Sequence, residues 1–119
     1  MQLVIGRYFE AWRSQNPELL TEVFTHDAKY LVRPFGIESY EGLEAIKGYW
    51  RAKPASIQIS PKPTIISQAF SEDSCFIEWE TTFTTPSDTT KIVRGMMRLE
   101  FDNGLVKELR EHYGSKEIA

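Results

Sequence analysis

The chain has 119 residues, a formal net charge of −3 at pH 7 and a hydrophobic content of 41%. This apolar content excludes an intrinsically disordered chain, and the length is enough for one domain with a hydrophobic core. The charge is acidic and no basic cluster is longer than a pair, which argues against nucleic acid as a partner. We therefore expect one domain over residues 1–119.

Cysteine and histidine are scarce in this chain. Cys75 is its only cysteine, which excludes an internal disulfide and a cysteine-rich metal site. Its two histidines lie far apart, so we expect no metal and no cofactor. The N-terminal stretch lacks the pattern of a signal peptide, and no run approaches the ~18 apolar residues of a membrane span. We expect a soluble cytoplasmic protein with no membrane contact.

The first half of the chain predicts three helices. Residues 3–14 carry Ile5, Tyr8, Phe9 and Trp12 at helical spacing. Asn16-Pro17 is a good helix start, because asparagine caps well and proline suits the first helical position. A short second helix follows, with Leu19, Leu20, Val23 and Phe24 on its buried side. Residues 42–50 form a third helix that its two glycines weaken.

The remaining segments predict strands. His26-Asp27 closes the second helix and opens a strand at residues 28–33, and a loop follows over residues 37–41. Strands at 57–60 and 64–70 are interrupted by prolines, which suits a sheet edge. Residues 75–85 alternate clearly between two faces. The order is helix, helix, strand, helix and then four antiparallel strands, which is an α+β fold with the helices on one face of a curved sheet.

The last two strands form a hairpin around Asn103-Gly104, the turn that favours two residues with positive φ. A simple register pairs Phe101 with Val106 and Met97 with Arg110. Paired residues share a sheet face. One face then holds mostly apolar residues together with three polar ones: Val93, Gly95, Met97, Leu99, Phe101, Val106, Glu108, Arg110 and His112.

The three polar residues of this face are the candidate catalytic group. Glu108 or His112 would move protons, because an apolar cavity raises a carboxyl pKa and histidine titrates near neutral pH. Arg110 would orient an anionic or carbonyl group. The alternative is a strand end that leaves the core and is solvated. A single bulge would also exchange the residues that face inward.

Further candidates would bind a ligand. Tyr30, Trp50, Trp79 and Met97 would form apolar walls, since ligand pockets are mostly apolar with a few polar groups. His26-Asp27 is a second polar candidate, and its alternative is a helix C-terminus. Each aromatic residue taken singly is also compatible with the core.

The other face of the predicted sheet mixes charged and apolar residues. Glu78 and Glu80 fall opposite or diagonal to Arg94 and Arg98, as in ordinary cross-strand ion pairs. Met96, Leu109 and Tyr113 on the same face are apolar. Such a mixed face is typical of a homodimer interface, and we expect a homodimer through these seven residues.

Several segments together resemble the NTF2-like superfamily, and within it the SnoaL-like, polyketide cyclase-like family. They are FEAW, NPELL, HDAKY, YEGLEAIKGYW and LEFDNGLVKELREHY, in that order over nearly the whole chain. The resemblance implies a cone-shaped fold, a strongly curved antiparallel sheet on three N-terminal helices, with a deep apolar pocket and dimerisation through the outer sheet face.

The resemblance also implies cofactor-independent isomerase, cyclase or dehydratase chemistry on a small, aromatic or carbonyl-bearing ligand. The aspartate that serves related cyclases just after the terminal aromatic stretch corresponds to Gly114 here. The alternative is therefore a non-catalytic ligand-binding or dimerisation module of the same fold.

Overall fold

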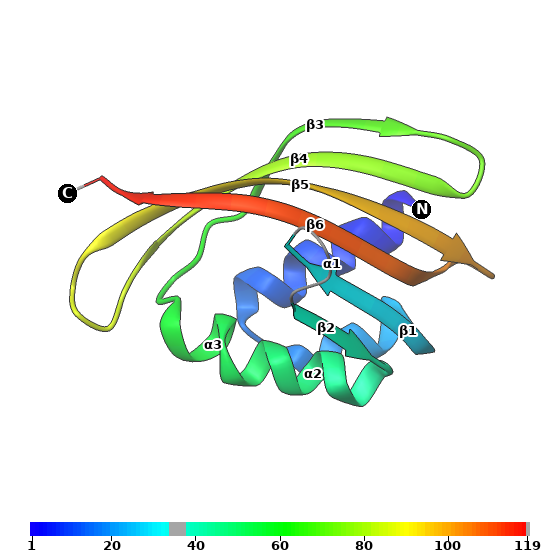
Figure 1. Cartoon of the computed structure of the whole chain (residues 1–119), viewed down its shortest axis with the longest axis horizontal. Helices are drawn as coiled ribbons and strands as arrows, with labels where there is room; N and C mark the ends of the chain where they lie inside the picture. The colour runs from blue at the N-terminus through cyan, green and yellow to red at the C-terminus, as the bar shows by residue number, and fades with distance from the viewer. Residues whose placement is uncertain (34–37, 119) are drawn as a thin grey trace.

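The computed structural model describes residues 1–33 and 38–118, and the helices lie on one side of the long strands (Figure 1). Among the described residues, no helix has the length and apolarity needed to cross a membrane. The elements in chain order are α1 (Gln2–Ser14), the 3-10 helix η1 (Pro17–Glu22), β1 (Phe24–Val32), β2 (Glu38–Glu41), α2 (Leu43–Ala52), α3 (Pro54–Ile57), β3 (Thr64–Phe70), β4 (Ser74–Thr84), β5 (Thr90–Asp102) and β6 (Leu105–Glu117).

The two N-terminal helices follow from local signals in the sequence. Helix α1 buries its apolar stripe and ends at Gln15, which adopts the left-handed conformation. The Asn16 side chain then accepts a hydrogen bond from the backbone N–H of Glu18 at 3.2 Å. The predicted second helix exists but is a 3-10 helix, and it ends at Glu22, so Phe24 begins β1 instead.

Three segments differ from the sequence-based expectation. Residues 38–41 form β2, where a loop was predicted, and residue 37 of that loop lies outside the described residues. The predicted strand at 57–60 is wrong, because α3 occupies its start and only Ile59 bridges to Thr84. Pro61 and Pro63 lack the N–H donors that a ladder needs, so this segment connects α3 to β3 and makes only isolated backbone hydrogen bonds to β4.

The sheet has six strands in the order β2-β1-β6-β5-β4-β3. Its pairs are antiparallel except for β1 and β6, which run parallel. The sheet is therefore mixed rather than fully antiparallel, because β1 enters after η1 and lies beside the last strand. The α+β class and the curved sheet with its helices on one face are as predicted.

The inner face of the sheet carries the core. Along β4, alternate residues are buried against the helices: Cys75, Ile77, Trp79, Thr81 and Phe83. This is the face that the alternation in the sequence predicts. Alternate residues of β1, namely Ala28, Tyr30 and Val32, are also buried.

The hairpin between β5 and β6 has a different register from the simple one. Asn103 and Gly104 have positive φ, as the predicted turn requires, and Phe101 pairs with Val106. The register then shifts by one residue, so that Glu108 pairs with Glu100 and Lys107 has no partner. One additional residue in one strand of a pair is a β-bulge.

The bulge reverses the facing of β6 beyond Lys107. Met97 pairs with Glu111 rather than with Arg110, and Met96 pairs with His112. The prediction that Glu108, Arg110 and His112 share the inner face is therefore wrong. Leu109, Glu111 and Tyr113 occupy that face instead, because sides alternate along a strand.

Candidate functional site

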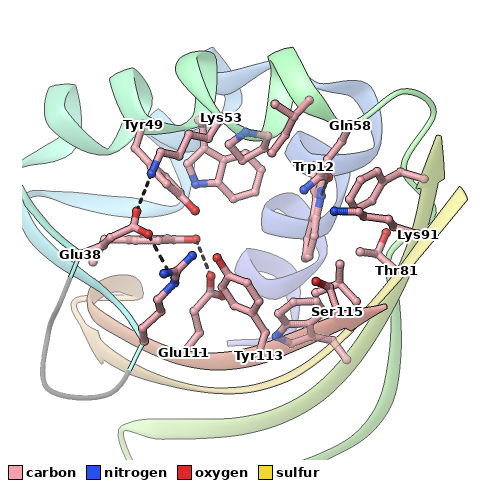
Figure 2. A pocket seen from close by; sticks show the side chains of 18 of the residues that line it. Trp12, Glu38, Tyr49, Lys53, Gln58, Thr81, Lys91, Glu111, Tyr113 and Ser115 are labelled. Carbon is pink, nitrogen blue, oxygen red and sulfur yellow. Dashed lines mark hydrogen bonds and ion pairs between the residues drawn. The ribbon is translucent and has the colours of Figure 1, made fainter. Parts of the chain in front are cut away.

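A cavity of about 460 Å³ lies between the inner sheet face and the helices (Figure 2). Its volume is within the range of small-molecule sites, roughly 300–1,000 Å³. Its walls are largely aromatic and come from α1, α2 and three strands: Tyr8, Trp12, Tyr30, Tyr49, Trp50, Trp79, Phe83 and Tyr113. Such walls favour an apolar ligand with planar groups.

Successive rows across β4, β5 and β6 form the cavity floor. The ladder places Trp79, Gly95 and Tyr113 in one row. A Cβ atom at Gly95 would lie 2.6 Å from the Trp79 ring and 2.8 Å from the Tyr113 Cβ atom. Glycine at this position therefore lets the two aromatic side chains approach each other over β5, where their ring centroids are 6.2 Å apart.

Glu111 is the carboxyl group inside this cavity. Its residue is 6% exposed, and its Oε1 atom accepts a hydrogen bond from the Tyr30 hydroxyl at 3.3 Å. Burial raises the pKa of Glu111 to about 7, the Tyr30 hydrogen bond lowers it, and the Glu38 charge raises it. A carboxyl group with this pKa exchanges a proton readily at neutral pH.

A chain of hydroxyl groups orients Glu111. The Tyr8 and Tyr30 hydroxyl oxygens are 3.3 Å apart. Because Tyr30 donates its proton to Glu111, its oxygen is free to accept the proton of Tyr8. Burial, followed by the Glu111 charge, raises the pKa of both tyrosines, so they remain protonated donors.

Two further hydroxyl groups face the same carboxyl. Figure 2 shows the Tyr49 hydroxyl descending from α2 and the Tyr113 hydroxyl rising from β6, both beside Glu111. Burial is the main cause that raises the pKa of Tyr49, and the Glu111 charge adds to it. The Glu111 end of the cavity thus holds one proton acceptor among several neutral hydrogen-bond donors.

Ion pairs surround Glu38 at the edge of the cavity. Lys53 Nζ lies 3.0 Å and Arg33 Nε 3.5 Å from the Glu38 carboxylate, and the Tyr40 hydroxyl donates to it at 3.2 Å. Partial burial would raise the pKa of Glu38, but the hydrogen bond and charge of Lys53 outweigh it, and the pKa is lowered. Glu38 therefore stays ionised and is a poor proton donor at neutral pH.

Three of the predicted wall residues line the cavity, namely Tyr30, Trp50 and Trp79. Met97 is buried in the core and is not among the lining residues. His26 and Asp27 are exposed on β1 and also do not line the cavity. They lie inside the strand rather than at the end of a helix.

The predicted catalytic residues lie on the outer sheet face. Arg110 Nε is 3.0 Å from Glu108 Oε2, and Arg98 Nη2 is 3.3 Å from the same oxygen. The Arg110 hydrogen bond is the main cause that lowers the pKa of Glu108. His112 is exposed on the same face, opposite Met96. The structure therefore does not bring these three side chains to the cavity.

The sequence reasoning missed Glu111, Tyr113 and the tyrosine chain. One signal was present in the sequence, since Val106 and Leu109 are both apolar but are three positions apart. Both side chains are fully buried on the inner face. In a regular strand, residues three apart point to opposite faces. One additional, unpaired residue between Val106 and Leu109 lets both side chains point inward, and Lys107 is that residue.

The outer face has part of the predicted composition. Glu80 pairs with Arg94, with a 2.8 Å contact between Oε2 and Nε, as expected. Met96 is 58% exposed on this face. Leu109 and Tyr113 were predicted here, but the bulge places them on the inner side, so this part of the prediction is wrong.

A family model described as a SnoaL-like domain matches residues 5–109. No functionally curated protein matches the sequence. Many solved structures share the fold. One is a hypothetical protein with a ketosteroid isomerase-like fold from Catenulispora acidiphila in complex with trimethylamine, with 20% identity over 91% of this chain and 82% of that chain and a TM-score of 0.80.

Two structural neighbours are enzymes by name. A type 2 hexachlorocyclohexane dehydrochlorinase has 11% identity over 99% of this chain and 86% of its own, with a TM-score of 0.83. An epoxide hydrolase/cyclase-like enzyme of pyran ring formation in salinomycin has 15% identity over 98% and 95%, with a TM-score of 0.81. At these identities the likeness supports the fold alone.

Proposed function

Because the chain belongs to the family of SnoaL-like domains, we propose that it is a cofactor-independent enzyme that moves a proton next to a carbonyl group. The observation that carries this proposal is Glu111, a buried carboxyl whose pKa is raised to about 7 inside an aromatic cavity. A general base works best when its pKa lies near the operating pH.

In the proposed reaction, the Glu111 carboxylate removes a proton from the carbon beside the ligand's carbonyl group. The electron pair of the broken C–H bond moves to the carbonyl oxygen and forms an enolate. The Tyr49 or Tyr113 hydroxyl donates a hydrogen bond to that oxygen, which stabilises the developing charge. Tyr30 holds the carboxylate in place throughout.

The enolate has three outcomes that need no other reagent. Glu111 can return the proton to a different carbon of a conjugated system, which is an isomerisation. The enolate electron pair can instead form a C=C bond to the neighbouring carbon, while a leaving group there departs with the pair of its own bond and takes the proton from Glu111, which is a dehydration or a related elimination. The enolate carbon can also attack a second carbonyl carbon of the same molecule, whose π electron pair moves to its oxygen and takes the proton from Glu111, which is a cyclisation.

Hydrogen exchange tests this proposal without knowledge of the natural substrate. A panel of aromatic and cyclic ketones, with and without a carboxylate, is incubated in D₂O with the protein. NMR then follows the loss of the proton signal beside the carbonyl. We expect exchange with some members of the panel, and we expect the Glu111→Gln variant to lose it while Glu108→Gln keeps it.

Two results would reject the enzyme proposal. Exchange that persists in Glu111→Gln would remove Glu111 as the base. Binding of panel members to wild type with no exchange would support the alternative, a non-catalytic ligand-binding module. Quenching of tryptophan fluorescence measures that binding, because all three tryptophans of the chain line the cavity.

We further propose that a second copy of the chain covers the outer sheet face in a cytoplasmic homodimer. The support is a mixed surface in which exposed Phe76 and Met96 lie among the ion pairs of Arg94 and Arg98. Sedimentation of wild type and Met96→Lys tests it, with Ile118→Lys as the control for an exposed apolar residue elsewhere. A monomeric wild type, or a Met96→Lys variant that still dimerises, would overturn it.

A further inference from the structure

The charge of the cavity is opposite in sign to that of the whole chain. Its charged lining residues are Arg33, Lys53, Lys91, Glu38 and Glu111, which are three cations and two carboxyl groups. The lining therefore carries +1 when Glu111 is ionised and +2 when it is protonated, whereas the chain carries −3. A concave site with walls of low dielectric focuses such a local field on its ligand.

Lys91 is the cation of this lining that forms no ion pair with a carboxylate of the described residues. Lys53 and Arg33 both lie within 4 Å of Glu38, and within the described ranges no carboxylate lies within 4 Å of Lys91. Its nearest acid along the ladder is Glu117, which is opposite Lys91 in register but is not among the cavity residues. Figure 2 shows the Lys91 side chain extending from β5 into the cavity toward Trp12 and Gln58.

Neutral hydrogen-bond donors accompany Lys91 at this end. Trp12 Nε1 donates to Gln58 Oε1 at 2.8 Å. Because an indole N–H is only a donor, the Gln58 amide must present its oxygen to Trp12, which leaves its NH₂ group for other partners. The Thr81 hydroxyl is buried and has no hydrogen-bond partner among the described residues. An unpaired buried hydroxyl is costly, so a ligand acceptor there would be favourable.

From this arrangement we infer that the cavity takes an organic anion, an elongated apolar molecule whose carboxylate is bound by Lys91. The inference deepens the proposed function, because it adds a second anchor far from the base. Lys91 and Glu111 are separated by six residues along the ladder, roughly 20 Å of strand at about 3.3 Å per residue. The Lys91 and Glu111 side chains extend into the cavity and shorten this span (Figure 2), so a ligand that contacts both groups needs about the length of two rings or more.

The same aromatic walls would also suit a ligand of opposite charge, an organic cation. A carboxylate within an aromatic cage can bind a substituted ammonium ion, and one structural neighbour is in complex with trimethylamine. In this chain the surplus of cations works against such a ligand, and protonation of Glu111 would remove the counter-charge at its end. The sign of the preferred ligand is therefore the decisive measurement.

Three probes of one shape measure that sign. They are biphenyl-4-carboxylate, biphenyl-4-methanol and biphenyl-4-methylammonium, titrated into the full chain by calorimetry at pH 7, with tryptophan fluorescence as the check of cavity occupancy. We expect the carboxylate to bind at least about tenfold more tightly than the alcohol, because a hydrogen bond to a charged group adds that much. We expect the ammonium probe to bind most weakly.

Variants assign the preference to Lys91. Lys91→Met keeps the apolar stem, and we expect it to weaken carboxylate binding about tenfold while alcohol binding is unchanged. Lys91→Arg keeps the positive charge and should bind the carboxylate almost as tightly as wild type. Lys107→Met, at the exposed bulge, is the matched control and should bind all probes as wild type does. Glu117→Gln should bind the carboxylate as tightly as wild type or more tightly.

Thermal unfolding of each variant accompanies the titrations, so that a fold defect is recognised and the uncharged variant Lys91→Gln can replace Lys91→Met. Equal carboxylate affinity in wild type and Lys91→Met, tightest binding of the ammonium probe, or no carboxylate binding at millimolar concentration would each overturn the inference. These titrations involve no turnover. Lys91-dependent binding without hydrogen exchange would reject the enzyme alone, and exchange with Lys91-independent binding would reject the anion site alone.

Discussion

Glu108 and Glu111 lie three residues apart on the same strand and have opposite environments. Glu108 is on the outer face beside Arg110 and Arg98, which lower its pKa. Glu111 is on the inner face, where burial raises its pKa to about 7 and a tyrosine replaces the arginines. The first carboxylate is ionised and structural at neutral pH, whereas the second can gain or lose a proton.

The two glutamates differ because their side chains point to opposite faces of the sheet, although the residue type is the same. An odd separation on a strand places two side chains on opposite faces, and the bulge at Lys107 decides which of the two faces inward. Without it, Glu108 would face the helices and Glu111 the solvent. A single additional residue near the turn thus selects the carboxyl group that enters the cavity.

The largest expected effect separates the two glutamates in catalysis. We expect the rate of proton exchange to rise with pH and level off above a midpoint near 7, because only the ionised Glu111 is a base. Glu111→Gln should lower the rate about 100- to 10,000-fold, the usual contribution of a general base. The measurement is the pH profile of exchange for any ketone that wild type accepts. A flat profile between pH 5 and 8 would contradict this assignment.

The second largest difference between Glu111 and Glu108 is expected in the pH dependence of folding stability. The pKa of Glu111 is higher in the folded chain, about 7, than its ordinary 4.5, so the folded state holds the proton more tightly. Its contribution is fully present below pH 4.5 and is lost as pH rises through 7. We expect the free energy of unfolding to fall by about 3 kcal/mol from this group, as measured by urea denaturation between pH 4.5 and 8.

Two variants check the origin of that slope. Glu111→Gln should remove it and should be relatively most favourable at pH 8. Glu108→Gln should keep it, because a lowered pKa contributes stability that is lost only as pH falls below the ordinary range. A slope that survives in Glu111→Gln would assign the pH dependence to another group.

A smaller effect compares two glycines on the two faces. We expect Gly95→Ala to destabilise the fold by about 1–3 kcal/mol, because its Cβ atom would lie 2.7 Å from the His112 carbonyl oxygen, which is backbone and cannot move aside. Gly114→Ala should change stability by less than about 0.5 kcal/mol, since no atom lies within 4 Å of its added carbon. Thermal and urea unfolding measure both, and equal losses would contradict the close packing over β5.

The smallest effect concerns an ion pair of the outer face. Glu80 and Arg94 are 2.8 Å apart, but the Arg94 side chain is largely exposed. In the Met96→Lys background, which we expect to be monomeric, a double-mutant cycle with Glu80→Gln and Arg94→Gln should give a coupling of about 0.2–1 kcal/mol that decreases with added salt. A coupling well above this range would indicate that the outer face is covered rather than solvated.

Much of the fold could be predicted from local patterns. The stripe of α1, the cap at Asn16, the alternation of β4 and the Asn103-Gly104 turn each depend on neighbouring residues, so sequence alone placed them. The parallel pairing of β1 with β6 could not be predicted, because it joins segments about 80 residues apart and has no local signal. Strand β2 was missed because four residues are too few to show a period.

The candidate site was predicted only in its walls. Tyr30, Trp50 and Trp79 could be proposed because large aromatic residues on apolar faces are buried wherever those faces meet. The polar residues required the register of β6, and a register that is wrong by one residue exchanges every side chain between the two faces. Glu108, Arg110 and His112 were therefore proposed in place of Glu111 and Tyr113.

The sequence by itself determined the family, through the family model that matches residues 5–109. It also determined the α+β class and an aromatic interior, because these follow from composition, period and turn chemistry along the chain. Only the tertiary structure decided which carboxyl group is buried and which cation faces the cavity. The first depends on the bulge of β6, which sets the direction of each side chain beyond Lys107. The second depends on the helices that close the cavity over the Lys91 end of β5 (Figure 2). The chemistry proposed for Glu111 and Lys91 is thus a property of the assembled fold.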